Sequence, residues 1–528
     1  MTSTLFTNGT LLTMNPAQPR AEALLVRGDK IEAVGGREEL RALCGGEPCR
    51  EVDLAGNTLL PGFIDGHSHI SQFAQSLRFA QLRQARSMDD LLKLLNAFIQ
   101  DNNIPEGAWV VGMGYDPQRL REKAHPLRGV LDRIAGHPVI VTADSGHMGC
   151  MNSRALSLAD VTAESADPAG GHIGREADGH PSGYLEENAF FSVAGVIPKP
   201  TEAELMNCLA RAQQIYASFG VTTAQEGLMH PADFDLLRKA GETGRLTLDI
   251  VGYADIRERD LFPHGQPRWG LDPQNRFRVG GYKMFLDGSP QGRTAWLTTP
   301  YLPKDGQPAG YRGYPVMEDG QVLRFVRLAA QDGMQLLTHC NGDAAIDQLL
   351  DAHRQPSGTR NVIIHAQLMR RDQLPRVKAL GLMPSYFVAH VHRYGDTHIQ
   401  NLGMQRASLI SPVRSTAELG IPYTLHQDTP VMLPNMLHTL YCAMCRTTEA
   451  GVLLGPDERV TLHQALLGVT LFGAYQSFDE SLKGALRPGM RADLAVAQGD
   501  WLLDAAESFR DKQVLQTYRA GELIFERN

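Results

Sequence analysis

Residues 59–69, LLPGFIDGHSH, pass from an apolar run through two glycines to two histidines, and this stretch decides the fold. Seven further apolar runs follow it, most of them separated by helical patterns. An alternation of strands and helices favours a parallel sheet. We therefore expect an α/β fold, a (β/α)8 TIM-like barrel. Its eight predicted strands are 59–69, 221–227, 246–255, 280–288, 334–340, 361–367, 382–387 and 421–428.

The two ends of the chain have a different pattern from the middle. Short alternating apolar segments there are separated by turns such as Gly-Asp and Gly-Asn, which is typical of β-strands. We predict a small β-sandwich domain built from residues 1–58 and 481–528, with the barrel in residues 59–480. A long insertion, about residues 70–215, follows the first barrel strand. Insertions at this place commonly build a lid or a substrate wall.

The composition is that of a globular protein, and it excludes several functions. The 528 residues are 43% hydrophobic and 21% charged, with a net charge of −8 spread along the chain. No basic stretch predicts nucleic-acid or membrane binding, and no apolar run or N-terminal pattern predicts a membrane span or a secretory signal. Seven cysteines at irregular spacing argue against a disulfide framework. We expect a cytoplasmic protein that acts on a small molecule.

Two histidines close the first predicted strand. Because a strand alternates its side chains with a period of two, His67 and His69 should point into the barrel at one level. Neutral imidazoles on one face are good zinc ligands. The alternative is a pair of polar residues that cap a strand.

Four more candidates lie at or near the ends of later strands. His339 and His365 each follow an apolar run, where barrel enzymes place their chemistry, although either could be a core histidine. Asp428 could bind a metal and accept a proton from metal-bound water, or it could cap the next helix. Lys283, in an apolar strand, requires either a salt bridge or carboxylation by CO₂ to a metal-bridging carbamate.

This set of residues resembles the amidohydrolase superfamily, and within it the YtcJ-like branch (amidohydrolase family 3) that includes N-substituted formamide deformylase. The resemblance covers nearly the whole chain. The segments PGFIDGHSH, YKMFLDGSPQGRTA, THCNGD, VIIHAQ and HQDTPV match the metal motifs of the family. The insertion contributes ADSGHMGCMNSRAL and PSGYLEENA, which match two further motifs of this branch.

The resemblance implies a hydrolase of a non-peptide carbon–nitrogen bond, such as that of an N-substituted formamide or an N-acyl amide. It implies two divalent cations, zinc by expectation with other divalent cations as alternatives, and an N6-carboxylated lysine bridging them. Asp428 would also act as general acid and base. The implied metal ligands are His67, His69, Lys283, His339, His365 and Asp428.

The same resemblance implies contacts with the substrate by His147, Glu187, Arg293 and His390, and a catalytic role for His147. A simple loop position is an equal alternative for His147, and Glu187 could instead pair with an arginine. Arg293 could clamp a substrate carboxylate or pair with a neighbouring loop. Glu226, at the end of the second strand, could support a ligand histidine or be solvated.

Two other functions stay open. One is a mononuclear zinc deaminase or cyclic amide hydrolase on the same fold; the deaminases generally place a Glu a few residues after the histidine of strand five, where this chain has Asp343. The other is a catalytically inactive barrel that binds a ligand or partner, which the complete ligand set disfavours. Because similar enzymes are often dimers or larger, a homodimer or higher homo-oligomer is the expected assembly.

Overall fold

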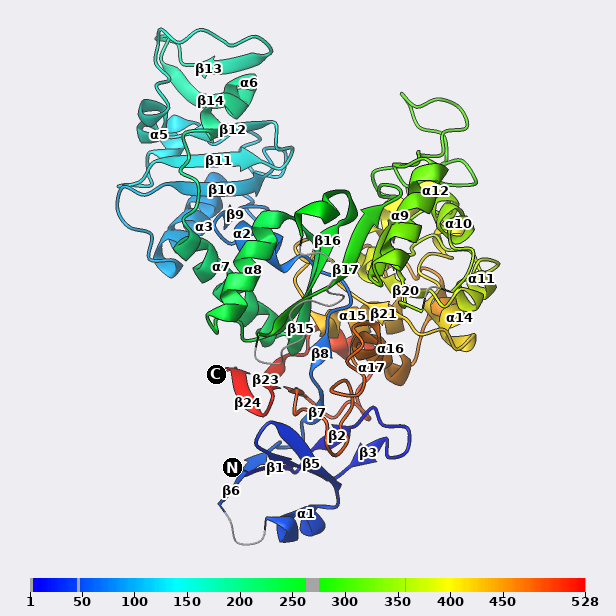
Figure 1. Cartoon of the computed structure of the whole chain (residues 1–528). Helices are drawn as coiled ribbons and strands as arrows, with labels where there is room; N and C mark the ends of the chain where they lie inside the picture. The colour runs from blue at the N-terminus through cyan, green and yellow to red at the C-terminus, as the bar shows by residue number, and fades with distance from the viewer. Residues whose placement is uncertain (1–2, 45–47, 263–274, 357, 528) are drawn as a thin grey trace. The chain divides into compact units, whose positions relative to one another are not determined.

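The computed structural model divides into two compact units (Figure 1). One unit is made of Met1–Phe73 and Leu209–Asn528, and the other of Ala74–Cys208. The residues that the structure describes are 3–44, 48–262, 275–356 and 358–527. Within these ranges no helix is both long enough and apolar enough to cross a membrane. All seven cysteines lie in these ranges and are free.

An eight-stranded sheet forms the centre of the first unit. Its strands follow one another in chain order from edge to edge, and all the neighbouring strands pair in parallel. The predicted α/β fold with a parallel sheet is therefore confirmed. The strands are β8 (Phe63–Ile64), β15 (Val221–Met229), β16 (Asp249–Asp255), β17 (Phe277–Phe285), β18 (Gln335–Cys340), β19 (Val362–His365), β20 (Met383–Tyr386) and β21 (Thr424–Leu425).

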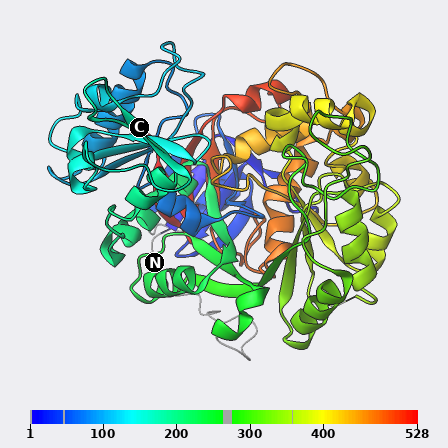
Figure 2. The same ribbon diagram turned by 90° about the horizontal axis from the view of Figure 1, so that it is seen from above.

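Helices connect these strands and cover the sheet. Helix α9 (Asp319–Gln331) shows why they pack there, since its buried residues recur at spacings of three and four and form one apolar stripe. That stripe consists of Val322, Phe325, Val326 and Ala329. In Figure 2 the yellow-green and yellow helices of this half of the unit lie along one outer side of the sheet. The helices cover the outer face of these strands, and the curled sheet encloses the inner face. Strands buried on both faces have continuous apolar runs.

The stretch LLPGFIDGHSH forms two strands, so the prediction of one continuous strand over 59–69 is wrong. β7 (Thr58–Pro61) pairs with strands from the chain ends, whereas β8 belongs to the central sheet. Gly62 lies between them, and a Cβ there would be 2.5 Å from Thr222. Glycine lets the chain pass closely from one sheet to the other. The alternating pattern does not reveal this change of partner strand.

The first and last strands of the central sheet approach each other at their carboxyl ends. A Cβ on Gly66 would lie only 2.6 Å from Thr424 of β21. The backbone nitrogen of His69 donates to the carbonyl of Thr429 at 2.8 Å. Gln476 links both edges, because it donates to the Gly66 carbonyl at 2.8 Å and accepts from Thr424 Oγ1 at 2.6 Å. The sheet is therefore strongly curled.

Strands from both ends of the chain share a second sheet. β7 pairs in parallel with β2 (Thr10–Leu12) and antiparallel with β22 (Leu494–Ala497), beyond which lies β23 (Val514–Arg519). Phe6 packs edge-on against Tyr518 of β23, with ring centroids 5.2 Å apart, and so joins this sheet to a third one. The third sheet consists, in order, of β5 (Lys30–Gly35), β4 (Ala23–Arg27), β1 (Ser3–Thr7) and β6 (Cys49–Asp53).

The second unit contains a six-stranded mixed sheet and several helices. Helix α3 (Met88–Asp101) begins after Ser87, whose side chain accepts a hydrogen bond from the backbone of Asp90. It buries three leucines against the strands. In sheet order the strands are β13 (Gly171–Arg175), β14 (Pro181–Glu187), β12 (Met148–Met151), β11 (Val139–Ala143), β10 (Val110–Tyr115) and β9 (Ala80–Gln81).

Candidate metal centre

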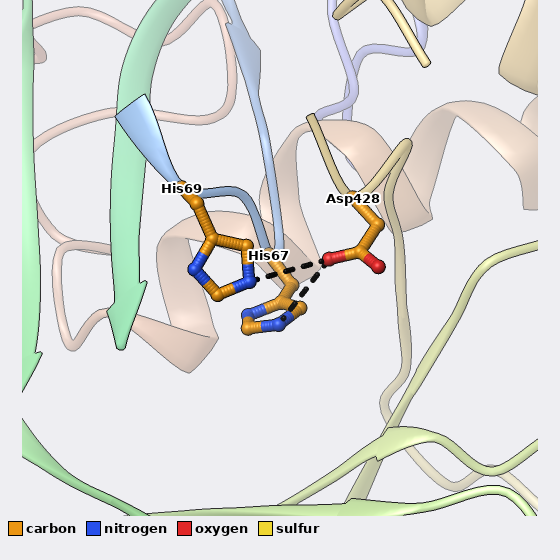
Figure 3. A group of neighbouring side chains, drawn as sticks. All are labelled: His67, His69 and Asp428. Carbon is orange, nitrogen blue, oxygen red and sulfur yellow. Dashed lines mark ion pairs between the residues drawn. The ribbon is translucent and has the colours of Figure 1, made fainter. Parts of the chain in front are cut away.

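His67, His69 and Asp428 form a compact group of potential metal ligands at the carboxyl end of the central sheet (Figure 3). Asp428 Oδ1 lies 3.6 Å from His67 Nε2 and 3.5 Å from His69 Nε2. One ligand atom of each residue falls within 4.8 Å of the others. Figure 3 shows the two rings on the same side of the carboxylate. A single cation could therefore contact all three residues.

Lys283 of β17 lies beside this group and is fully buried. Its Nζ is 3.1 Å from Nε2 of His67. Among the described residues no carboxylate lies within salt-bridge distance of Nζ, so the salt bridge considered from the sequence is not formed there. Burial lowers the pKa of the Lys283 amine to about 7, because leaving water disfavours the charged form. A neutral amine is the form that can react with CO₂.

Two further histidines extend the group. His365 Nε2 lies 3.9 Å from Asp428 Oδ2, and the ring of His339 packs against that of His365 with centroids 4.7 Å apart. All six residues predicted as ligands therefore form one continuous cluster. His365 and Asp428 have φ angles of 69° and 54°, a left-handed conformation that is uncommon outside glycine and is often found at functional sites.

Several buried atoms of this cluster have no hydrogen-bond partner. Within the part of the chain that the structure describes, these include His67 Nδ1, His339 Nδ1 and Asp428 Oδ1. Leaving such an atom unpaired costs roughly 1–3 kcal/mol, so buried polar atoms are normally satisfied. A divalent cation would give Asp428 Oδ1 the partner that it lacks. Imidazole nitrogens with a carboxylate oxygen are also a donor set that zinc accepts, so the residues fit a metal.

Three candidate ligands have the protonation states that metal binding requires, whereas His69 must release a proton when a cation binds. Burial alone would raise the pKa of Asp428, but the contact with His69 and nearby positive charge hold it well below its usual value. Burial keeps the pKa values of His67 and His365 well below normal, so both are neutral. For His69, burial would lower the pKa, but contacts with Asp428 and Glu226 raise it to about 9. Ionised carboxylates and neutral imidazoles are the metal-binding forms.

Glu226 supports one of the candidate ligands from behind. Its Oε1 lies 3.5 Å from His69 Nδ1, while its Oε2 accepts from the backbone nitrogen of Ser71 at 2.7 Å. Its side chain is buried, which excludes the solvated strand end considered from the sequence. Carboxylates in this position orient metal-binding histidines.

His426 also supports the cluster, and the sequence reasoning did not single it out. Its Nε2 lies 3.2 Å from His365 Nδ1. It precedes Asp428 by two residues, the same spacing that separates His67 from His69. Period-two counting along the last strand therefore provided a signal that could have identified it.

Arg293 is held inside its own loop region. Its guanidinium donates to Gln307 Oε1 at 2.6 Å, Asn401 Oδ1 at 3.1 Å and the carbonyl of Leu302 at 2.7 Å. It also lies over the ring of Tyr301, 4.8 Å from the centroid. These neutral acceptors favour a role in fixing the loop over either the carboxylate clamp or the ion pair considered from the sequence.

His390 opens helix α12 (Ala389–Leu402) and is the histidine of this helix that packs against the candidate ligands. Its ring centroid is 5.7 Å from that of His365. His398 is buried and bonded to Gln367 at 2.8 Å, and His392 Nδ1 lies 2.8 Å from a backbone carbonyl. His390 and His398 also pack edge-on, with ring centroids 6.1 Å apart, and His390 is the one that reaches His365.

His147 and Glu187 both lie in the second unit, where they contact each other. Nδ1 of His147 is 3.1 Å from Oε2 of Glu187, and the backbone nitrogen of Glu187 donates to the His147 carbonyl at 2.8 Å. Both side chains are about half exposed. Glu187 has a φ of 50°, another left-handed conformation. The partner of Glu187 is therefore this histidine and not the arginine considered from the sequence.

The fold and this cluster agree with the comparisons with known proteins. The pattern of the amidohydrolase family matches residues 50–525, and the chain belongs to that family. It is 29% identical to the N-substituted formamide deformylase of Arthrobacter pascens, over 100% of this chain and 99% of that protein. It is 28% identical to Protein LONG AFTER FAR-RED 3 of Arabidopsis thaliana, over 99% and 91% of the two chains.

A crystal structure of an uncharacterized metal-dependent hydrolase from Pyrococcus furiosus has the same fold. Its TM-score is 0.73 at 22% sequence identity, and the match covers 96% of this chain and 100% of that one. With the family match, this makes the chain an amidohydrolase that acts on carbon–nitrogen bonds.

Proposed function

We propose that the chain is a binuclear zinc hydrolase that cleaves a non-peptide carbon–nitrogen bond, of an N-substituted formamide or an N-acyl amide. The observation that carries the proposal is the buried Asp428 Oδ1, which faces two histidines and has no partner. The similarity to a formamide deformylase supports the substrate class. With a formamide, one water would be consumed and the products would be an amine and formate.

In this proposal the ligands divide between two cations. His67, His69 and Asp428 would hold the first, and His339 and His365 would hold the second. When bound, the cations lower the pKa of a water molecule and polarise the substrate carbonyl.

Lys283 would complete the centre as a carbamate. Its neutral amine would form a bond to CO₂ and release a proton, and the resulting carbamate would supply oxygen ligands for the metal. Asp428 would take a proton from the attacking water and deliver it to the leaving nitrogen. His147, Glu187 and His390 would contact the substrate, while Arg293 would act by holding its loop.

We also propose that the curled sheet closes as a (β/α)8 barrel. The approach of Gly66 to Thr424 and the bridging by Gln476 support closure. Residues 1–58 and 481–528 would form the β-sandwich domain. Free cysteines are consistent with a cytoplasmic protein, and a homodimer or higher homo-oligomer is proposed by analogy with similar enzymes.

A mononuclear hydrolase is the second candidate, and one observation favours it. Among the described residues, the group whose ligand atoms all lie within 4.8 Å of one another is His67, His69 and Asp428. A deaminase is less well supported. Asp343, at the position of the deaminase glutamate, is bonded to Thr298 and accepts from Arg370 at 2.9 Å.

Elemental analysis tests both candidates, on protein purified without chelator or affinity nickel. About two zinc ions per chain would support the binuclear centre. About one would favour the mononuclear candidate. Absence of metal, with no amide or formamide hydrolysis after addition of zinc, manganese or cobalt, would contradict both.

A further inference from the structure

We propose that His426 and Ser385 form a hydrogen-bonded relay that fixes which nitrogen of His365 is free to bind a metal, with His426 as a positioning residue. The inference rests on the proposed function, because it takes His365 as a metal ligand. It extends that function by assigning a role to two residues outside the ligand set.

The relay crosses three neighbouring strands. His365 ends β19, Ser385 lies on β20, and His426 directly follows β21. His365 Nδ1 is 3.2 Å from His426 Nε2, and His426 Nδ1 is 2.8 Å from Ser385 Oγ. His426 and Ser385 are both fully buried, so water has no access to replace either contact.

The hydrogen-bond chain can run in only one direction when His365 binds a metal. His365 Nε2 faces Asp428 Oδ2 at 3.9 Å, so this nitrogen must carry the lone pair. A neutral imidazole has one N–H, which therefore sits on Nδ1 and donates to His426 Nε2. His426 must then carry its own proton on Nδ1 and donate to Ser385 Oγ. Ser385 Oγ can accept this hydrogen bond, so the relay holds His426 and His365 in the tautomers that leave Nε2 of His365 free for a metal.

Packing prevents the ring of His426 from turning away from this arrangement. Phe387 stacks against one face, with centroids 5.6 Å apart and an interplanar angle of 28°. His67 contacts it edge-on, with centroids 5.4 Å apart. Both nitrogens of His426 have partners, whereas His67 Nδ1 and His339 Nδ1 in the same cluster have none. Polar contacts therefore hold the His426 ring at both of its nitrogens.

The relay also distinguishes His365 from His69 and His339. His69 has the carboxylate of Glu226 behind it, while His365 has a neutral imidazole. A carboxylate makes its histidine a stronger donor, so His365 should be a weaker donor than His69, and also weaker than His339, whose Nδ1 lies 3.4 Å from Asp287 Oδ1.

A zinc titration of metal-free protein against a chromophoric chelator tests the relay. His426→Phe keeps a ring but removes both nitrogens, and should weaken the second zinc equivalent about 10–100-fold while leaving the first unchanged. His426→Gln restores an acceptor near the position of Nε2 and should recover most of the affinity. Ser385→Ala should weaken the same equivalent less than His426→Phe. The visible spectrum of cobalt-loaded protein should change in the same order.

His353→Phe is the matched control, because His353 is another buried histidine of this unit, bonded to the Leu349 carbonyl and to Asn361. It should alter thermal stability without altering zinc affinity. If wild type binds two zinc ions, His365→Ala loses one and His426→Phe binds both with wild-type affinity, the relay is wrong and the proposed centre stands. If His365→Ala loses none, the proposed centre fails and the relay with it. If His426→Phe does not fold, the other two variants still test the relay. Equal losses of zinc affinity in His426→Gln and Ser385→Ala would contradict an acceptor role for position 426.

Discussion

The two ends of the central sheet both bury charged groups, but they satisfy them differently. At the amino end, Asp249 opens β16 and accepts from Lys483 and Arg519 at 2.7 Å each, and from Arg491. At the carboxyl end, Asp428 is half-buried among nitrogen atoms, yet its buried Oδ1 has no hydrogen-bond partner. The same sheet thus carries one carboxylate that is fully hydrogen-bonded and one that is not.

This difference distinguishes the charged cluster at the amino end, which supports the fold, from the candidate metal centre at the carboxyl end. The pairs Arg491–Asp493 and Arg278–Asp479 extend the amino-end network, so its carboxylates are matched within the protein. A buried charge matched in this way supports the fold, whereas an unmatched one is a cost that a bound ion can remove. Substitutions at the amino end should therefore change stability and those at the carboxyl end should change chemistry.

The largest expected effect is at the carboxyl end. Asp428→Asn should lower kcat/KM about 10⁴-fold, since it removes the proposed proton acceptor and a charged metal ligand. The free energy of unfolding of the metal-free protein should fall less than in Asp249→Asn, because Asp428 Oδ1 loses its contacts with His67 and His69 but no hydrogen bond. Steady-state kinetics and urea unfolding measure the two quantities. Near-normal turnover would contradict the proton transfer through Asp428.

At the amino end, a substitution should lower stability and leave activity unchanged. Asp249→Asn should lower the free energy of unfolding by about 3–5 kcal/mol, because Lys483, Arg491 and Arg519 remain buried with less negative charge to pair with. Zinc content and kcat should be unchanged in the protein that remains folded. Asp351→Asn, which breaks an ion pair with Arg376 involving an exposed carboxylate, is the control and should have little effect.

Lys283→Met tests whether a buried amine belongs with the site or with the structural cluster. Activity should fall about 100-fold, with loss of metal, because no carbamate can form. The metal-free variant should be at least as stable as wild type, since Lys283 is buried without a carboxylate partner and methionine removes that cost. Elemental analysis and urea unfolding check both statements. A clear loss of stability with full metal content would assign Lys283 to the structural cluster.

The sequence predicted the carboxyl end of the sheet far better than the amino end. His67 with His69 and the histidines after apolar runs are local patterns, and parallel strands align their carboxyl ends automatically. The amino-end network joins positions 249, 483, 491 and 519, which no periodicity connects. Its existence follows only from the folded topology.

The limits of local patterns also explain one error and one prediction that the contacts do not favour. The single strand predicted over 59–69 divides at Gly62, because the close approach of Thr222 is a tertiary contact. Arg293 suggested a substrate clamp, but Gln307 and Asn401, 14 and 108 residues further along the chain, occupy its guanidinium. Sequence spacing shows which side chains share a face and does not show which partners arrive from distant segments.

The smallest expected effect concerns acid stability. Burial would raise the pKa of Asp249, but Lys483, Arg491 and Arg519 hold it well below its usual value. The folded protein therefore binds fewer protons at this carboxylate than the unfolded chain does. Its contribution to stability is complete above the unfolded pKa of about 4 and is lost as the pH falls toward the folded pKa.

The unfolding free energy of wild type should consequently decrease between about pH 5 and pH 3 more steeply than that of Asp249→Asn, and urea unfolding across this range measures both slopes. Asp351→Asn should keep the wild-type slope. Parallel slopes for wild type and Asp249→Asn would mean that the three cations do not favour the ionised carboxylate. The amino end would then hold its charges by packing, and pairing would no longer distinguish it from the metal centre.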